Sequence, residues 1–446
     1  MWLFAVTLSG LLLSGFATAT LAAPRAPQAL RWGWAFGLGS GWLSLSLGAA
    51  ALLGLPPSAA MVVPLVPIGW WAATQLRHER GEIGCDLSNA LPPGLLFLVL
   101  LPAFTLALTT PLPGWDGLAI WGFKGRIFFV EDRIPLEYFK DPVTSYSHPE
   151  YPLHLPLLLA GLAKFIGRWE DSLLLAVAPV FYASLLLLLY GTIRLSWRPW
   201  YALLILAGVA PLPGLFGHIP VGYADLPLTT YVAGTLAGLT LWLSRGERGA
   251  LSIAALSAGL GGWTKNEGLM LLLVCWVVAW IWAPRSRQPR GQLMVAFGLA
   301  LSIALPWHFF RLIQGIPTEP FAAQGLWQLQ RIPVIIMAMG REMAAFGHWG
   351  GVWIVAVAVS FSWPWLSRKA GNPVGGFFSA VLLSGLAAYV GVYALTPRDL
   401  GWHLATSLDR LLLHLLPAAA LVVGTGIHAL LAEDRQGPEI VPIPPM

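Results

Sequence analysis

The segment from Gly114 to Arg126 holds the residues whose types and spacing point most directly to chemistry. It reads Gly-Trp-Asp-Gly-Leu-Ala-Ile-Trp-Gly-Phe-Lys-Gly-Arg and lies where a hydrophobic pattern gives way to an amphipathic one. Asp116 comes first and is followed by two cations, Lys124 and Arg126. A carboxylate in a cleft at a membrane surface can take up a proton, and nearby cations can hold a phosphate. The pattern therefore suggests chemistry on a phosphate-bearing lipid.

Each of these side chains also has a structural interpretation. Asp116 follows a Pro-Leu-Pro-Gly turn and could be the N-cap of a helix, a role that is compatible with that of a base. Lys124 and Arg126 could lie at the membrane interface with their charged ends directed towards water. The residues alone leave both interpretations open.

Composition indicates a membrane protein. Of the 446 residues 57% are hydrophobic and 11% are charged, against about 25% charged in an ordinary soluble domain, and the mean hydropathy is +0.70. The net charge of +5 is small and forms no basic block, which argues against nucleic acid as a partner. Cys85 and Cys275 are the two cysteines, too few for a disulfide framework or a cysteine metal site.

Hydropathy predicts an all-α polytopic membrane protein with about 13 transmembrane helices, since a span needs roughly 20 apolar residues. The predicted spans are Met1–Ala23, Trp32–Leu55, Met61–Leu76, Pro92–Thr110, Asp171–Ile193, Pro199–Gly217, Leu226–Ser244, Ala250–Trp263, Gly268–Pro284, Gly291–Leu312, Gly350–Leu366, Gly376–Leu395 and Leu412–Leu431. Met1–Ala23 lacks the cations of a signal peptide, so we expect a retained span. Tyr151–Gly167 is short and opens among prolines, so we expect an interfacial or re-entrant helix.

Charge in the loops predicts the orientation. Alternate loops are short and basic, which is typical of the cytoplasmic side. Their cations are Arg25, Arg31, Arg77, Arg80, Arg194, Arg198, Arg245, Arg248, Arg285, Arg287, Arg290, Arg368, Lys369 and Arg435. We therefore expect the N-terminus outside, the C-terminus inside, and the long loop Pro111–Glu170 on the outer face.

This orientation brings several polar motifs to the outer face, each at the edge of a span. Ionisable residues there are costly and are functional candidates. Besides the Asp116 segment, the motifs are Ser147-His148-Pro149-Glu150-Tyr151-Pro152, Gly222-Tyr223-Ala224-Asp225-Leu226-Pro227, Trp263-Thr264-Lys265-Asn266-Glu267-Gly268, and Asp399–Arg410 with Trp402-His403 and Asp409-Arg410.

The order of these motifs resembles that of GT-C membrane glycosyltransferases. The branch that it is most similar to holds protein O-mannosyltransferases, lipid A aminoarabinose transferases and rhizobial lipopolysaccharide sugar transferases. The resemblance covers roughly Pro92 to Leu431. It implies a GT-C-like bundle, a polyprenyl-phosphate sugar donor, and an extracytoplasmic acceptor that is a lipid, glycan or protein. It also implies a first outer loop with juxtamembrane helices and a catalytic Asp, and a second outer loop with another Asp.

We therefore expect three parts in the chain and a multi-pass protein of the cytoplasmic membrane. Residues 1–91 would be an N-terminal extension of three spans, 92–431 the glycosyltransferase module, and 432–446 a short Pro-rich cytoplasmic tail. The extension departs from the family pattern, in which the catalytic loop follows the first span.

The chemistry assigns a role to each candidate. Transfer of a sugar to a hydroxyl needs a base, for which we choose Asp116, with Asp225 orienting the acceptor or holding a metal. The departing lipid phosphate needs cations, which are Lys124, Arg126, Lys265 and Arg410. The remaining substrate-binding candidates are His148, Glu150, Tyr223, Glu267, Trp402 and His403.

These residues could also serve the structure alone. Asp225 could belong to an ordinary turn before a helix, and a Lys265–Glu267 pair could close a short loop. His148 and Glu150 could be metal ligands or part of a proline-rich turn, and two ligands do not define a metal site. Trp402 could anchor the chain at the membrane interface, and Asp409 could form an ion pair with Arg410. No cofactor is demanded, and a divalent metal is compatible with the set without being identified by it.

Two further classes of function stay open. A polytopic transporter or flippase would be expected to show internal repeats and ionisable residues at mid-span, and neither is evident. A polysaccharide ligase or polymerase tends to use Arg and His of a late outer loop. The late loop Ile313–Trp349, with Arg311 at its edge, carries Arg331, Arg341 and His348, which keeps that class open.

Overall fold

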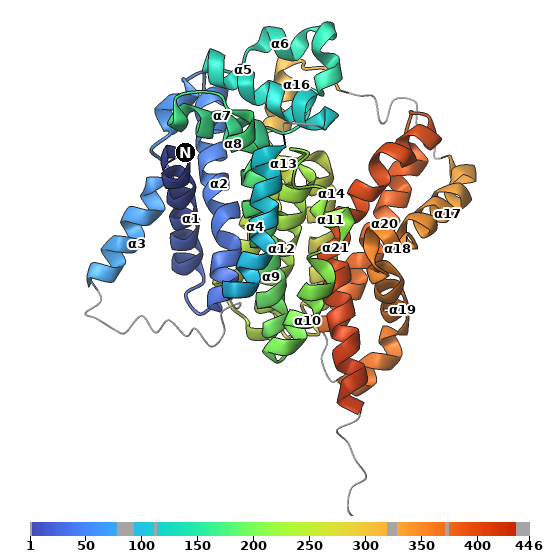
Figure 1. Cartoon of the computed structure of the whole chain (residues 1–446). Coiled ribbons are helices and arrows are strands. Elements are labelled where there is room, and N and C mark those ends of the chain that lie inside the picture. Colours follow the sequence, from blue (N-terminus) through green and yellow to red (C-terminus); the bar gives the residue numbers. More distant parts are fainter. Residues whose placement is uncertain (1, 78–92, 111–113, 319–327, 371–373, 434–446) are drawn as a thin grey trace, which may run out of the picture.

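The computed structural model describes residues 2–77, 93–110, 114–318, 328–370 and 374–433, and all regular structure within them is helical. The prediction of an all-α protein is therefore confirmed. Upright helices form a bundle, and a surface segment (residues 114–167) lies over one end of it (Figure 1). This segment includes the short helices α5 (Phe123–Glu131), α6 (Leu136–Lys140) and α7 (His154–Ile166). The predicted boundary between residues 91 and 92, Cys85, Arg80, Arg435 and the tail from 434 onward fall outside the described residues.

The elements follow one another along the chain without strands in the described part. Those up to the end of the surface segment are α1 (Trp2–Ala22), α2 (Gln28–Leu52), η1 (Pro57–Ala60), α3 (Leu65–Arg77), α4 (Pro93–Thr109), the π-helix η3 (Gly117–Gly122), α5 (Phe123–Glu131), α6 (Leu136–Lys140), η4 (Pro142–Ser147) and α7 (His154–Ile166). The middle of the chain forms α8 (Asp171–Leu175), α9 (Val177–Arg194), α10 (Pro199–Val209), α11 (Pro213–Phe216), α12 (Asp225–Arg245), α13 (Arg248–Thr264), α14 (Asn266–Trp282), α15 (Arg290–Ala304) and α16 (Pro306–Gln314). The remainder forms η5 (Leu329–Arg331), α17 (Ile332–Met343), α18 (Phe346–Trp349), α19 (Val352–Ala370), α20 (Val374–Leu395) and α21 (Leu400–Glu433).

The number of full-length spans is lower than predicted. Within the described residues, 6 helices are long and apolar enough to cross a membrane, or 7 if α15 and α16, bent by 44° at their junction, form one span. The count of about 13 is not supported. Mean hydropathy over a stretch of sequence does not detect a break between two short helices. The predicted span Pro199–Gly217, for example, is interrupted between α10 and α11. Other predicted spans are short helices, such as α14 with 17 residues.

The surface segment is fixed to the bundle by polar contacts at its turns. Asp132 ends α5 in a left-handed conformation and accepts hydrogen bonds from the backbone N–H and the hydroxyl of Ser58. The Lys164 ammonium of α7 lies 3.0 Å from the same carboxylate. With 13 residues, α7 is too short to span a bilayer, as expected for the excluded stretch Tyr151–Gly167.

The N-terminal helix α2 is packed into the same core as the later helices. The indole N–H of Trp34 donates to Gly234 O at 3.0 Å, and the Tyr231 hydroxyl donates to Gly37 O at 2.9 Å. His154 of α7 joins this contact through both ring nitrogens, at 2.6 Å from Ser44 Oγ and 3.0 Å from Tyr231 Oη. Helices α2, α7 and α12 are thus tied together by a buried polar network.

Several predicted basic loops gather at one end of the bundle. A Cβ on Gly249 would meet Ala22 O at 1.8 Å, and one on Gly246 would meet the Gln288 side chain at 3.3 Å. The loops after α1, α12 and α14 therefore lie together. Since α12 has 21 residues and spans about 30 Å, these loops lie far from its first residue, Asp225. The side chains of Arg77, Arg368 and Lys369 are not described.

Candidate functional site

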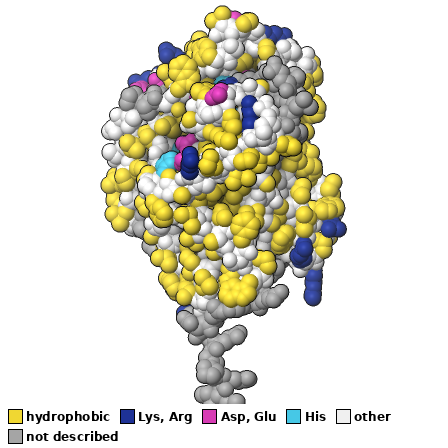
Figure 2. All heavy atoms as spheres, turned by 90° about the vertical axis from the view of Figure 1, so that its right-hand side faces the viewer, with side chains coloured by type: hydrophobic (Ala, Val, Ile, Leu, Met, Phe, Trp, Pro, Cys, Tyr) yellow, Lys and Arg dark blue, Asp and Glu magenta, His cyan; other side chains and the backbone are white. Residues whose placement is uncertain are grey.

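A cavity of about 920 Å³ lies at the end of the bundle where α12 begins. Its walls come from the surface segment, the loop before α12, the turn between α13 and α14, helix α16 and the start of α21. Figure 2 shows a hollow with histidine, acidic and basic side chains in the upper half of one face, above a surface that is mostly hydrophobic. A polar cavity at one end of an apolar bundle is a suitable place for a ligand with a charged head group.

The cavity brings together most of the candidate residues. Those in its wall are Asp116, His148, Glu150, Tyr223, Lys265, Glu267, Trp402, His403 and Arg410. Asp225 is fully buried directly behind this wall. Besides Asp225, the candidates that the structure does not bring to the cavity wall are Lys124 and Arg126.

Asp225 is the centre of a buried ionic network. Its Oδ1 lies 2.8 Å from Lys265 Nζ and 2.8 Å from His414 Nε2, and its Oδ2 lies 3.1 Å from Arg410 Nη2. The second ring nitrogen of His414 lies 3.0 Å from Tyr389 Oη. Because Asp225 has no exposed surface and several basic partners, its arrangement suits the placement of cations better than direct contact with a substrate.

Asp116 is joined to this network through Arg410. Arg410 Nη2 lies 2.7 Å from Asp116 Oδ2, so one guanidinium bridges the two carboxylates. Asp116 occupies the N-cap position of η3 but makes no side-chain capping hydrogen bond there, so the capping contact of the alternative interpretation does not form. The side chain keeps 18% of its surface exposed at the cavity. The Asp116 carboxylate is therefore accessible from the cavity and held in place by Arg410.

Tyr223 supports the same pair from the side. The Arg410 guanidinium carbon lies 4.8 Å from the centre of the Tyr223 ring, a cation–π arrangement. The ring also rests on Gly114, where a Cβ would come within 2.4 Å of it. Gly114 is thus required for the close approach of the Asp116 segment to the loop before α12. Arg410 forms ion pairs with Asp116 and Asp225. The alternative pair between Asp409 and Arg410 is not formed among the described residues.

Lys265 lies in the tight turn that the sequence predicted. It is the residue between α13, which ends at Thr264, and α14, which begins at Asn266. Its ammonium lies between Asp225 and Glu267, 3.1 Å from Glu267 Oε1. The predicted Lys265–Glu267 pair forms, and Lys265 also lines the cavity. The two roles are not exclusive.

His148 and Glu150 form a second polar pair in the wall. His148 Nδ1 lies 3.0 Å from Glu150 Oε1, and His148 has a φ of 49°, in the left-handed region that a non-glycine residue rarely adopts. The Trp307 indole N–H donates to Glu150 O at 3.1 Å and fixes this turn to α16. The described residues contain no group of three His, Cys, Asp or Glu side chains placed to hold a metal ion.

Lys124 supports this turn without lining the cavity. It is fully buried, and its ammonium donates to His148 O at 2.6 Å and lies 5.6 Å from the centre of the Trp121 ring. Burial lowers the pKa of Lys124 to about 7, although Glu150 opposes the shift. Lys124 therefore holds the His148 turn in place. Arg126 is exposed on α5 and does not line the cavity.

The last polar motif lies on a helix and not in a loop. Helix α21 begins at Leu400, twelve residues before the predicted span, and carries Trp402, His403 and Arg410. His403 Nδ1 lies 2.9 Å from Thr396 Oγ1, and Trp402 is half exposed with the Arg398 guanidinium 4.9 Å from its ring. The helix continues inwards, so Arg410 and His414, four residues apart, present the same face to Asp225.

Several residues of this site carry little signal in the sequence. His414 and Tyr389 lie within predicted spans, where an isolated polar residue gives no indication of its partner. His218 and Arg311 also line the cavity. His218 could have been found, because it precedes the Tyr223 motif in the same predicted outer segment. Arg311 stands at the edge of the late loop, apart from the polar motifs.

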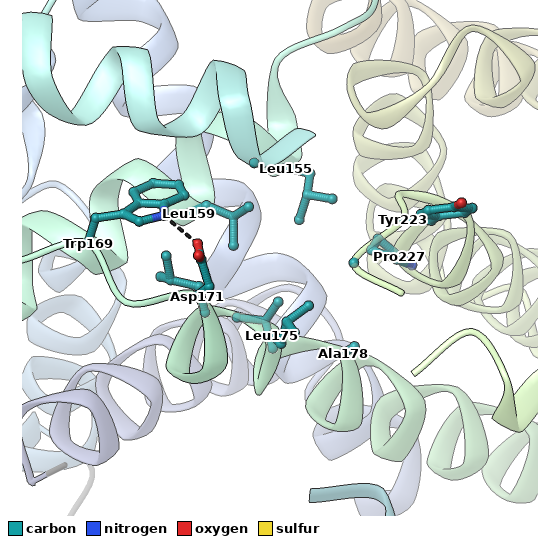
Figure 3. A pocket seen from close by; sticks show the side chains of 12 residues that line it. Leu155, Leu159, Trp169, Asp171, Leu175, Ala178, Tyr223 and Pro227 are labelled. Carbon is teal, nitrogen blue, oxygen red and sulfur yellow. Dashed lines mark hydrogen bonds between the residues drawn. The ribbon is translucent and has the colours of Figure 1, made fainter. Parts of the chain in front are cut away.

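A small apolar pocket lies beside the cavity and shares Tyr223 with it. Figure 3 shows Leu155, Leu159 and Trp169 on one side and Tyr223 and Pro227 on the other, with the Trp169 indole donating to Asp171. Its volume is about 20 Å³, room for about one water molecule. In this state the pocket does not hold a ligand by itself.

No family model, characterised protein or solved structure matches this chain.

Proposed function

We propose that this protein is a membrane glycosyltransferase that moves a sugar from a polyprenyl-phosphate donor to an extracytoplasmic acceptor. The observation that carries the proposal is the cavity at the end of an apolar bundle. Its wall places an accessible carboxylate, Asp116, beside the cations Lys265 and Arg410. A donor whose lipid part lies in the bilayer would bring its phosphate to such a place. The proposal includes the cytoplasmic membrane as location and its outer face as the side of reaction.

The transfer can be written with the residues present. Asp116 Oδ1 takes the proton of the acceptor hydroxyl while that oxygen forms a bond to the anomeric carbon of the donor. The bond from this carbon to the phosphate oxygen breaks, and its electron pair leaves with the polyprenyl phosphate. Lys265 and Arg410 offset the negative charge that grows on the phosphate. Asp225 keeps these two cations in position.

The test uses purified protein, a panel of synthetic undecaprenyl-phosphate monosaccharides, and extracted envelope lipids and glycans as acceptors. We expect wild type to consume at least one donor and release undecaprenyl phosphate. Asp116→Asn preserves the shape and should reduce the turnover by about 100-fold or more, while undecaprenyl phosphate still binds. Lys265→Met is the donor-side comparison and should weaken that binding. Near-normal transfer by Asp116→Asn would reject Asp116 as the base.

A polysaccharide ligase or polymerase is the second candidate, because His348 of the late loop and Arg311 at its edge line the same cavity. It would also use a lipid-linked sugar, but its donor would carry a glycan. Transfer of preformed oligosaccharides that survives Asp116→Asn and fails in Arg311→Met would favour it. A transporter or flippase would move the lipid without cleaving the donor, so the release of the lipid carrier without its sugar separates both enzymes from that class.

A further inference from the structure

His218 differs from the other buried histidines in its surroundings. It is 8% exposed and lines the cavity, where its ring meets Tyr223 edge-on with ring centres 6.4 Å apart. His154 and His414 are fully buried, and each uses both ring nitrogens in contacts with neighbouring side chains. His218 Nδ1 has no hydrogen-bond partner among the described residues.

An unpaired polar atom in this position is costly. Leaving a buried donor or acceptor unsatisfied typically costs about 1–3 kcal/mol, and such atoms in native proteins are uncommon. At a cavity wall, a small rotation of the ring would offer a nitrogen to a ligand. The missing partner of His218 is therefore best supplied by a polar group that enters the cavity.

The charge state of His218 decides which group it can receive. Burial lowers its pKa to about 4, against the opposing effects of Asp225 and Asp409 and with the help of Arg410 and His414. At neutral pH the ring is uncharged, so one nitrogen accepts a hydrogen bond and the other donates one. A hydroxyl group can pair with either nitrogen because it both donates and accepts, whereas an uncharged ring attracts a phosphate less than a cation does.

We propose that His218 binds a hydroxyl group of the acceptor, which makes the acceptor a carbohydrate with more than one hydroxyl. This inference rests on the proposed function. Asp116 receives the proton of the reacting hydroxyl, so His218 holds a neighbouring one. The contacts of Tyr223 with both His218 and Arg410 place this second hydroxyl beside the Asp116–Arg410 pair. A serine or threonine side chain, with one hydroxyl, would not use both residues.

The experiment compares His218→Phe and His218→Gln in purified protein with an undecaprenyl-phosphate monosaccharide that wild type cleaves. Acceptors are a panel of methyl hexosides and a serine-containing peptide, and sugar released to water is measured in parallel. We expect His218→Phe to lower kcat/KM for the hexoside by about 10-fold, the scale of one hydrogen bond. His218→Gln should recover part of the loss. Hydrolysis of the donor and binding of undecaprenyl phosphate should stay at the wild-type level.

His308→Phe is the matched control, since His308 Nε2 also lacks a partner among the described residues but the residue does not line the cavity. It should leave transfer unchanged. Equal losses in transfer and hydrolysis, unchanged transfer in His218→Phe, or a preference of wild type for the peptide would overturn the inference. If wild type cleaves no donor of the panel, the proposed function fails and the role of His218 fails with it. Equal losses, unchanged transfer in His218→Phe or a preference for the peptide would instead leave the transferase proposal standing.

Discussion

At the scale of single residues, the sequence identified the charged residues of the site but, apart from the Lys265–Glu267 pair, not their partners. Asp116, Asp225, Lys265 and Arg410 were all candidates, and the structure joins them in one network. The partners of Asp225 could not be predicted, because they come from the turn after α13 and from α21, far apart in the chain. His414 lies deep in α21, and only the fold reveals that it faces Asp225. The burial of Lys124 under the His148 turn likewise depends on tertiary packing.

Asp225→Asn should destabilise the protein as well as impair transfer. The change keeps the shape but removes the charge that compensates Lys265 and Arg410 in a buried place. Removing one member of a buried ion pair typically costs about 3–5 kcal/mol. We expect a lower midpoint of thermal unfolding in detergent and weaker binding of undecaprenyl phosphate. Asp409→Asn is the control, because Asp409 lines the cavity without an ion pair to the described residues. Equal midpoints for the two variants would contradict the central role of Asp225.

Lys124 predicts a dependence of stability on pH. Its pKa is lowered from 10.5 to about 7 in the folded protein. Between these values the unfolded chain binds a proton that the folded protein has released, so the free energy of unfolding rises with pH. We expect thermal unfolding in detergent to show wild type gaining stability relative to Lys124→Met from pH 7 to pH 10. A difference between the two that is independent of pH would show that Lys124 has an ordinary pKa.

At the scale of elements, apolar sequence predicted where helices lie better than how long they are. Helices α12 and α20 begin and end within a few residues of their predicted spans. The failures occur at breaks and extensions that hydropathy does not register. Proline at position 306 begins a new helix after the bend, and α21 extends through a polar segment because that segment packs its charged face on α12. Both the bend before α16 and the extension of α21 depend on tertiary contacts, which a short stretch of sequence does not contain.

The turn between α13 and α14 depends on Gly268. A Cβ there would lie 2.0 Å from Gly261 O, a distance that requires the helices to separate. Gly268→Ala should therefore displace Lys265 from Asp225 and lower stability by about 1–3 kcal/mol, the usual cost of overpacking. Thermal unfolding and undecaprenyl phosphate binding measure the two effects. Gly298→Ala on α15, where a Cβ would meet nothing within 4 Å, is the control and should lower neither, since alanine favours a helix more than glycine does. Two variants with the same behaviour would rule out this steric role.

At the scale of the whole molecule, the polar cavity and the basic loops occupy opposite ends of the bundle. The cavity lies at the start of α12 and the loops after α1, α12 and α14 lie together at the other end. Loop charge alone had suggested this separation, because cations accumulate on the cytoplasmic side of membrane proteins. Between the two ends, many large apolar side chains face outwards, such as Leu98 and Val295. This distribution suits a protein that reacts on one side of a bilayer.

The two ends should respond differently to a thiol reagent that does not cross membranes. Ser145 is exposed on the surface segment and Ser244 is exposed near the end of α12, so each accepts a reporter cysteine. In a background with Cys85 and Cys275 replaced by serine, we expect Ser145→Cys to be labelled in cells with a permeable outer layer and an intact cytoplasmic membrane. Ser244→Cys should be labelled only after that membrane is opened, because the Arg245–Arg248 loop is predicted to be cytoplasmic. The Ser244→Cys signal after lysis is the control for reactivity. Labelling of Ser244→Cys but not of Ser145→Cys in unopened cells would reverse the orientation and put the cavity on the cytoplasmic side, where an extracytoplasmic acceptor could not reach it.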